Sequence, residues 1–272
     1  MTVPTFSIVI PYYNRPELLV RAVNSVRSQS FQSWEVLVVD DASTIPVPHF
    51  SEDVQVIRRR TNGGGAAARN DGIRAARGSF ICFLDSDDYW LPTRLEDAFS
   101  FISRTKFEQN TIFFEDVLVK KANAIKLAYR NRLRPGASLS RHILCHGLIQ
   151  TSTLIVPNDG NLSFDDRLRL FQDLDYLIGA EKAKYRLEKI PYSNVIWDLI
   201  GDVNRLSRKE NPAAVSLFLE KHGDFLAPRV RDAFVLQNVD YWRRNRFNFF
   251  GFMRKTLFSD LAWKRKARLL FR

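Results

Sequence analysis

The stretch Ser79–Trp90, SFICFLDSDDYW, decides the fold of this chain. Its apolar run Phe80–Leu84 predicts a buried strand, and three carboxylates follow directly: Asp85, Asp87 and Asp88. Carboxylates this close repel one another unless a positive group lies between them. A divalent cation, completed by phosphate oxygens, is such a group, and open α/β sheets bind ligands at the carboxyl ends of their strands. The pattern predicts a metal-diphosphate site.

The sequence before this stretch alternates apolar runs with segments of helical periodicity. Three runs predict strands: Ser7–Ile10, Trp34–Val39 and Val54–Ile57. Two segments predict helices, one that opens at Pro16 and one over Ala66–Ala76. This alternation predicts an α/β fold with a doubly wound, mostly parallel sheet flanked by helices.

Acidic side chains follow two of the predicted strands, so they meet at one edge of the sheet. Asp40 and Asp41 end the second strand, and a carboxylate there can accept from a ribose hydroxyl or a base N–H. Tyr13, after the first strand, can stack on a planar base, and Arg69 can offer its fork to phosphate. Each residue also has an ordinary alternative role. An aspartate after a strand can simply form a turn, Tyr13 can be part of the core, Arg69 can be solvated, and Asp88 can cap a helix. Their convergence favours a nucleotide site.

Three stretches together resemble the nucleotide-binding half of the inverting family 2 glycosyltransferases, which have the Rossmann-like GT-A fold. They are SIVIPYYNRPELLVRAVNSVRSQSFQSWEVLVVDDAS, NGGGAAARNDGIRAARG and FICFLDSDDYWLPTRL. The resemblance covers residues 6–90. It implies that Asp41 binds a uracil-type base, that Tyr13 stacks on this base, and that Pro11 contributes through its backbone.

The resemblance also assigns the phosphate side of the site. It implies that Arg69 helps to hold the nucleotide. Asp85 and Asp87 form the Asp-x-Asp motif, with Asp87 on Mn²⁺ or Mg²⁺ and Asp85 nearer the ribose and metal. A later segment, NRLSR, resembles the part of related enzymes that reaches back to the diphosphate, which implies Arg205 and Ser207 as nucleotide-binding residues.

A second acidic segment is FDDRLRLFQDLDYLIGAEK, residues 164–182. Its periodicity predicts a helix from about Gln172, which places Asp173 where the helix dipole favours a charged carboxylate. On the residues alone, Asp173 is a helix cap. In the resembled family an acidic pair here supplies the general base, which implies Asp173 as the catalytic residue, although Gln172 replaces the first acid. Asp175 is the fallback base.

The remaining segments complete the predicted domain organisation. We predict a helix over Leu95–Ile102, a basic loop over residues 121–140 that is either solvated or a lid, and strands over Thr111–Lys120, Thr151–Val156, Tyr185–Ile190 and Asn194–Asp198. The catalytic domain spans residues 1–210, with a nucleotide-binding half (1–90) and an acceptor half (91–210). Residues 211–272 form a C-terminal helical extension, with helices over Asn211–Phe225 and from Pro228.

Charge is concentrated at the end of the chain. Of the net charge of +11, residues 241–272 carry +9. Apolar residues share a helical face there and Lys and Arg occupy the others, so we predict an amphipathic helix that contacts an anionic membrane surface, with packing on the catalytic domain as the alternative. No nucleic-acid module accompanies the charge, so nucleic acid is not a predicted partner. Two separated cysteines and no long apolar run predict a cytoplasmic protein, peripheral on the inner face of the membrane.

The predicted function is inverting transfer of a sugar from a nucleotide sugar, with UDP as the preferred nucleotide, to a glycan or lipid-linked acceptor of a bacterial surface polysaccharide. Asp173 acts as base and a divalent metal binds the Asp-x-Asp motif. Two alternatives stay open. One is a sugar nucleotidyltransferase, which also uses carboxylates and a metal but attacks phosphorus. The other is an inactive scaffold that retains the fold.

Overall fold

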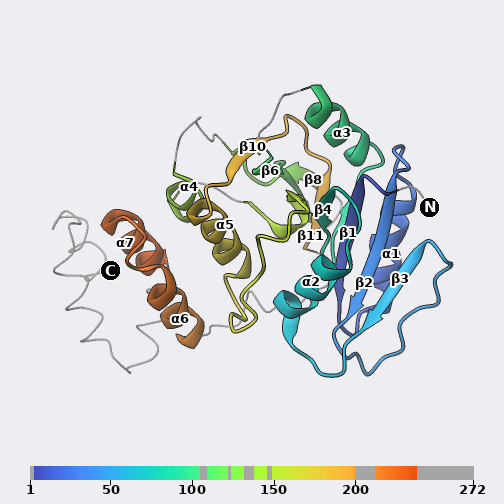
Figure 1. Cartoon of the computed structure of the whole chain (residues 1–272), viewed down its shortest axis with the longest axis horizontal. Helices are drawn as coiled ribbons and strands as arrows, with labels where there is room; N and C mark the ends of the chain where they lie inside the picture. Colours follow the sequence, from blue (N-terminus) through green and yellow to red (C-terminus); the bar gives the residue numbers. More distant parts are fainter. Residues whose placement is uncertain are drawn as a thin grey trace.

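A computed structural model describes residues 3–104, 109–121, 124–131, 138–145, 149–199 and 212–237 (Figure 1). Three of the sequence predictions fall outside these ranges. They concern Arg205, Ser207 and the basic segment 241–272.

A seven-stranded sheet forms the centre of the molecule, with strand order β10-β6-β9-β4-β1-β2-β3. The strands are β1 (Phe6–Tyr12), β2 (Trp34–Asp40), β3 (Val54–Arg58), β4 (Phe80–Phe83), β6 (Thr111–Phe114), β9 (Ile155–Pro157) and β10 (Arg186–Lys189). Only β9 is antiparallel to its neighbours in this sheet. The predicted α/β fold with a mostly parallel sheet is confirmed, and β1, β2 and β4 end at one edge.

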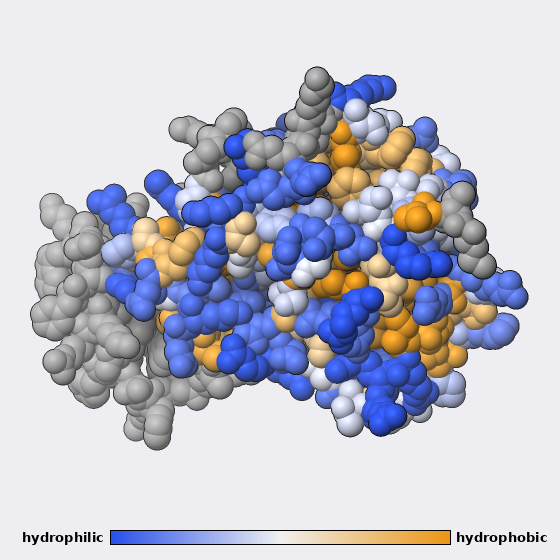
Figure 2. Space-filling view, viewed as in Figure 1, coloured by the Kyte–Doolittle hydropathy of each residue, from blue (hydrophilic) through white to orange (hydrophobic). Residues whose placement is uncertain are grey.

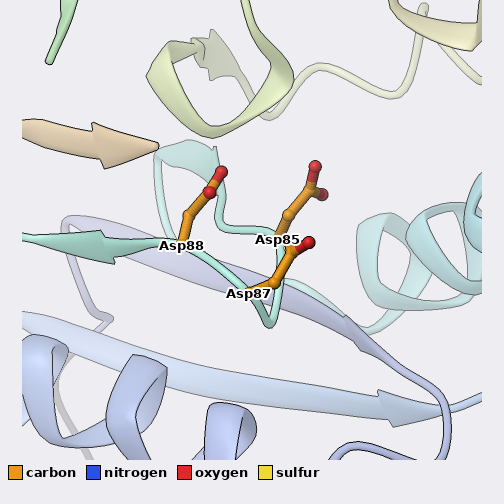
Figure 3. A group of neighbouring side chains, drawn as sticks. All are labelled: Asp85, Asp87 and Asp88. Atoms are coloured by element: carbon orange, nitrogen blue, oxygen red, sulfur yellow. The ribbon is translucent and has the colours of Figure 1, made fainter. Parts of the chain in front are cut away.

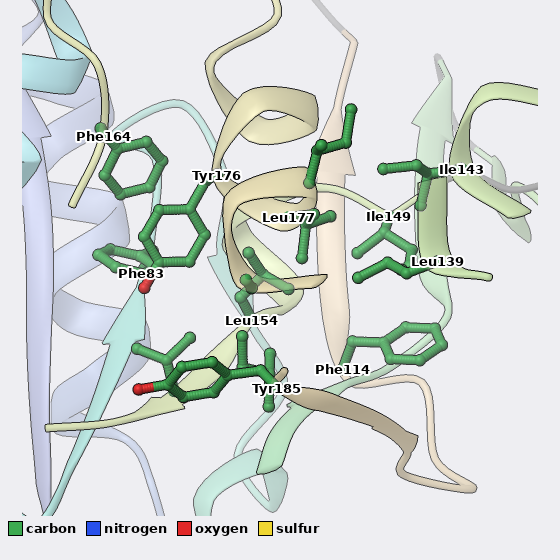
Figure 4. Packing of buried hydrophobic residues seen from close by; sticks show 14 of the residues in the cluster. Phe83, Phe114, Leu139, Ile143, Ile149, Leu154, Phe164, Tyr176, Leu177 and Tyr185 are labelled. Atoms are coloured by element: carbon green, nitrogen blue, oxygen red, sulfur yellow. The ribbon is translucent and has the colours of Figure 1, made fainter. Parts of the chain in front are cut away.

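Helices cover both faces of this sheet, and each face has its own apolar core. The helices α1 (Pro16–Arg27) and α3 (Arg94–Arg104) pack in one core with Ile8 and Ile10 of β1. Val9, between them, points into the other core, as the two-residue period of a strand requires. That core contains residues of five helices: α2 (Gly64–Ala75), α4 (Leu139–Cys145), α5 (Gln172–Lys182), α6 (Pro212–His222) and α7 (Pro228–Gln237) (Figure 1). Figure 4 shows part of this core, including residues of α4 and α5.

A second sheet of four strands corrects two predictions. Its order is β5 (Tyr89–Trp90), β11 (Val195–Asp198), β7 (Val117–Lys121), β8 (Ala124–Leu127). The strand predicted over Thr111–Lys120 is in fact two strands, β6 and β7, which belong to different sheets. The predicted loop over 121–140 begins with β8, whose four residues are all exposed and so give no alternating apolar pattern.

Buried charges explain where the predicted strand divides. Glu115 and Asp116 lie between β6 and β7, and both are buried. Glu115 pairs with Arg94 at 2.8 Å, and Asp116 pairs with Lys189 at 2.5 Å. Because buried carboxylates require cationic partners, these two contacts turn the chain out of the first sheet. A further correction concerns the strand predicted from Thr151: Thr151–Thr153 form a 3₁₀ turn, and β9 begins only at Ile155.

A close helix-strand contact fixes α2 against the sheet. A Cβ atom on Gly72 would lie 2.3 Å from Cγ1 of Val9, so only glycine permits this approach. One turn earlier on the same helix is Arg69, which is 7% exposed. The contact therefore sets the position of a candidate site residue.

Polar side chains cover most of the face of the molecule seen in Figure 2, and apolar side chains gather in separate patches. No described helix has the length and apolar content that a bilayer crossing requires.

We expect Arg94→Met to lower the free energy of unfolding by about 3–5 kcal/mol, because it leaves the buried carboxylate of Glu115 without its cation. The loss should shrink as the pH falls, since burial raises the pKa of Glu115 and protonation removes the unpaired charge. Urea unfolding measures both effects. The control is Arg74→Met, which removes an exposed pair with Asp71 and should change stability by less than about 0.5 kcal/mol. Equal losses in the two variants would contradict this expectation.

Candidate nucleotide and metal site

The acidic turn after β4 brings three carboxylates together. One oxygen of each of Asp85, Asp87 and Asp88 lies within 4.8 Å of the others, and Figure 3 shows all three rising from the same turn. The buried hydroxyl of Ser152 holds this turn: it accepts from the Asp85 N–H at 3.1 Å and donates to Asp88 Oδ2 at 2.6 Å. Asp88 also accepts from Gln150 at 3.2 Å. Asp88 is therefore a buried support, while Asp85 and Asp87 are partly exposed.

Arginines from the two neighbouring helices meet the accessible carboxylates. Arg15, at the start of α1, lies 3.3 Å from Asp87, and Arg21 of α1 donates to the Asp87 carbonyl at 2.6 Å. Arg69 of α2 pairs with Asp85. These cations offset the repulsion between the carboxylates and hold them in place.

The donor set fits a divalent metal. Hard cations such as Mg²⁺ and Mn²⁺ take oxygen ligands and commonly use one or two carboxylates with substrate phosphates. Asp85 and Asp87 offer this combination: two accessible carboxylates held close together at a strand end. Arg15 pairs with Oδ2 of Asp87 and Arg69 pairs with Oδ1 of Asp85, so the same carboxylates that would bind a metal are also held by cations.

The neighbouring strand end holds Asp41, which is 4% exposed. Its Oδ1 accepts from the Gly63 N–H at 2.8 Å and pairs with Arg59 at 2.5 Å, and its Oδ2 accepts from the Gly64 N–H at 2.6 Å. Asp41 thus caps the glycine turn that opens α2. Any hydrogen bond to a base N–H would use the lone pairs that these contacts leave.

The end of β1 supplies an accessible ring. Tyr13 is 46% exposed, whereas Pro11 is half-buried. Asn14 follows with a left-handed backbone (φ 53°), and its side-chain oxygen accepts from the backbone of Thr44 and Ile45 at 2.8 and 2.9 Å. This bridge ties the loop after β1 to the loop after β2, so Tyr13 and Asp41 lie on two joined loops.

Arg69 joins the two acidic segments. Its Nη2 pairs with Asp85, and its Nη1 donates to Oε1 of Gln172 at 3.0 Å. The guanidinium also lies 5.3 Å from the ring centroid of Phe164. The start of α5 therefore faces the acidic turn across a single buried arginine.

Asp173 lies in the first turn of α5, as predicted. Its Oδ1 accepts from the Leu174 N–H at 2.9 Å. Burial raises the pKa of Asp173, and the charge of Asp85 adds to this, while the positive charge of Arg69 opposes it. A carboxyl with a raised pKa is a stronger base than ordinary aspartate. Asp175, the fallback, is instead buried, in an ion pair with Lys221 and a hydrogen bond with His222, both 2.7 Å away.

Arg169, which lies just before α5, was not among the residues predicted for the site. Its Nη1 is 2.3 Å from where a Cβ on Gly64 would be, and Gly64 has a left-handed backbone (φ 84°). The side chain is exposed and makes no ion pair within the part of the chain that the structure describes. The only hint in the sequence was the glycine turn itself, because a turn without side chains leaves room for a side chain from a distant segment such as Arg169.

The sequence matches the model of the family described as Glycosyl transferase family 2 over residues 7–145. The chain belongs to this family. A second observation agrees: the chain is 37% identical over 236 residues to "UDP-Glc:alpha-D-GlcNAc-diphosphoundecaprenol beta-1,3-glucosyltransferase WfgD" of Escherichia coli, covering 78% of this chain and 90% of WfgD. The resemblance seen in the sequence is confirmed.

Other relatives match over different lengths. "Amylovoran biosynthesis glycosyltransferase AmsB" of Erwinia amylovora is 29% identical over 201 residues, 68% of this chain and 67% of AmsB. An uncharacterized glycosyltransferase of Rickettsia felis is 28% identical, and this chain spans only 42% of it. Among solved structures, S. aureus TarS 1–349 in complex with UDP-GlcNAc has a TM-score of 0.68 at 19% identity, covering 97% of this chain and 78% of that one. The predicted GT-A fold is confirmed.

We expect Asp87→Asn to weaken Mn²⁺ binding at least about tenfold, because it removes one negative charge from the ligand cluster without changing its shape. Isothermal titration calorimetry with Mn²⁺ and UDP measures this affinity. Asp53→Asn is the matched control, since Asp53 pairs with Arg27 away from the acidic turn. Unchanged Mn²⁺ affinity in Asp87→Asn would remove Asp87 from the metal site.

Proposed function

We propose that this protein transfers a sugar from a nucleotide sugar to a hydroxyl of a glycan or lipid-linked acceptor, with inversion at the anomeric carbon. UDP is the preferred nucleotide. The observation that carries the proposal is the double contact of Arg69, with Asp85 on one side and Gln172 on the other. It supports an arrangement in which the leaving-group side and the base side of one reaction lie next to each other.

The donor nucleotide binds at the ends of β1, β2 and β4. Tyr13 offers an exposed ring for stacking, and Pro11 and Asp41 line the same strand ends. Arg69 and the exposed Arg169 supply positive charge toward the donor. We extend the nucleotide site to Arg205 and Ser207, which lie outside the described residues.

The transfer is a single displacement. The acceptor oxygen attacks the anomeric carbon while its proton passes to a carboxylate oxygen of Asp173. The bond between the anomeric carbon and the diphosphate oxygen breaks, and the nucleoside diphosphate leaves with that electron pair. The raised pKa of Asp173 favours this proton transfer. Gln172 keeps Arg69 beside the base without adding a second charge.

A divalent metal, Mn²⁺ or Mg²⁺, would be held by Asp87 and Asp85. When bound, it would offset the negative charge that develops on the departing diphosphate. Arg15 and Arg21 keep Asp87 in position for this role through its side chain and its carbonyl.

The acceptor class follows from the relatives. WfgD is named for a lipid-linked acceptor, an alpha-D-GlcNAc-diphosphoundecaprenol, and AmsB for amylovoran biosynthesis. A lipid-linked saccharide of a bacterial surface polysaccharide is therefore the proposed acceptor here. The basic segment 241–272 would keep the enzyme beside it, at the cytoplasmic face of the membrane.

A donor screen tests the function directly. With Mn²⁺ and a lipid-linked acceptor, we expect release of a nucleoside diphosphate from one nucleotide sugar, and no release with a chelator.

We expect Asp173→Asn to lower kcat about 10²- to 10⁴-fold, because the base is lost, while the affinity for UDP is unchanged. Loss of UDP affinity in this variant would place Asp173 in the nucleotide site instead. In a separate assay with a nucleoside triphosphate and a sugar 1-phosphate, formation of a nucleotide sugar with release of pyrophosphate would indicate a nucleotidyltransferase.

The pH dependence of transfer provides a further check. Because the pKa of Asp173 is raised, we expect kcat/KM to fall on the acidic side of a pKa above the ordinary value of about 3.9. The folded protein then binds this proton more readily than the unfolded chain does, so protonating Asp173 adds to stability as the pH falls. Thermal unfolding over the same pH range should therefore show no parallel loss. An acidic limb at or below the ordinary aspartate value would contradict a raised pKa in the base.

A further inference from the structure

The residue that leads into α5 has a strained backbone. Phe171 has φ 61° and ψ 23°, the left-handed region that bulky side chains rarely adopt. Such a conformation persists only where the surroundings hold it. Its ring packs against Phe218 of α6, with centroids 5.6 Å apart, and against Phe234 of α7, at 5.2 Å. The two C-terminal helices therefore hold the residue directly before Gln172 and Asp173.

Helix α6 also holds the residue two positions after Asp173. Asp175 is buried, and its Oδ1 accepts from His222 Nε2 and from Lys221 Nζ, each at 2.7 Å. Lys182 Nζ lies 3.1 Å from His222 Nδ1. Since an ammonium group only donates, Nδ1 accepts this hydrogen bond, and Nε2 carries the proton given to Asp175. Lys221 also reaches Asp165 at 2.9 Å, in the loop before α5.

We infer that His222 and Lys221 of α6, with Phe218 and Phe234, are positioning residues for the base. The two phenylalanines pack on Phe171, and His222 and Lys221 bind Asp175, so the chain is held on both sides of Asp173. These contacts set where the carboxylate of Asp173 lies relative to the acceptor hydroxyl. This inference rests on the proposed role of Asp173. Under this inference α6 and α7 contribute to catalysis by positioning the base, although neither helix supplies a group that touches the substrate.

The physical reason is the sensitivity of proton transfer to distance. A misplacement of about 1 Å, caused by a change away from the chemistry, can cost about 100-fold in rate. The carboxylate of Asp173 is fixed by its own backbone position, since its Oδ1 contact is to the next residue of the same helix turn. A shift of Phe171 or Asp175 therefore moves the base directly.

The test uses the full chain and two substitutions of one residue. His222→Phe keeps a ring in the core but removes the donor to Asp175, and we expect kcat to fall about 10- to 100-fold with the affinity for UDP unchanged. His222→Gln retains an N–H donor and should recover most of the lost kcat. Lys221→Met removes the cation that pairs with Asp175, and it should lower kcat in the same direction.

Glu35→Gln is the matched control. Glu35 is also buried and bonded to two partners, Ser7 and Arg77, but it lies at the start of β2, at the opposite edge of the sheet from the site. We expect it to lower the melting temperature without lowering kcat. Unchanged kcat in His222→Phe and Lys221→Met, or an equal loss in Glu35→Gln, would overturn the inference. If Asp173→Asn keeps full activity, the proposed base fails as well. If it is inactive while the α6 variants are normal, only the positioning role fails.

Discussion

A buried arginine organises this molecule. Arg69 is 7% exposed, and a guanidinium with so little water around it must have acceptors from the protein. Asp85 and Gln172 supply them, from segments 87 residues apart in the sequence. Loss of Asp85 would leave the charge unpaired, and loss of Gln172 would leave a buried N–H of Arg69 without this acceptor. The acidic turn after β4 and the start of α5 are therefore held facing each other. The juxtaposition on which the proposed chemistry depends is a consequence of this requirement.

The supports around Arg69 come from several elements. Gly72 lets α2 approach β1, which sets the height of Arg69 over the sheet. Asp41 caps the turn before that helix, and Ser152 holds the acidic turn through its hydrogen bonds with Asp85 and Asp88. Each support is a buried polar contact or a close backbone approach, which permits few alternative positions. We therefore view the strand edge as a preorganised surface.

Local patterns in the sequence were sufficient for residues 6–90. Their strands and helices are short segments with clear apolar periodicity, and the carboxylates follow them directly, so β1, β2, α1 and the acidic turn could be predicted. The same periodicity misled further along the chain, where the apolar run from Thr111 continues across Glu115 and Asp116. The two sheets separate there because of partners, Arg94 and Lys189, that no local pattern reveals.

Contacts between distant segments also limited which site residues could be predicted from the sequence. Asp173 could be placed near a helix start, and Tyr13 beside a strand end, from their neighbours alone. The position of Arg169 over the glycine turn and the pairing of Asp175 with α6 depend on how distant segments pack. Lone arginines and lysines in a sequence are usually solvated, so nothing distinguished these from the others.

The shared core of α5, α6 and α7 has a practical consequence for shortened forms of the protein. A fragment that ends at residue 210 would resemble a complete sheet domain, yet it would lack Phe218 and Phe234, which complete one of the two cores. It would also remove Lys221 and His222, the two partners of the Asp175 carboxylate. Fragments made for crystallisation or for enzyme engineering should therefore extend at least to Gln237, the end of α7.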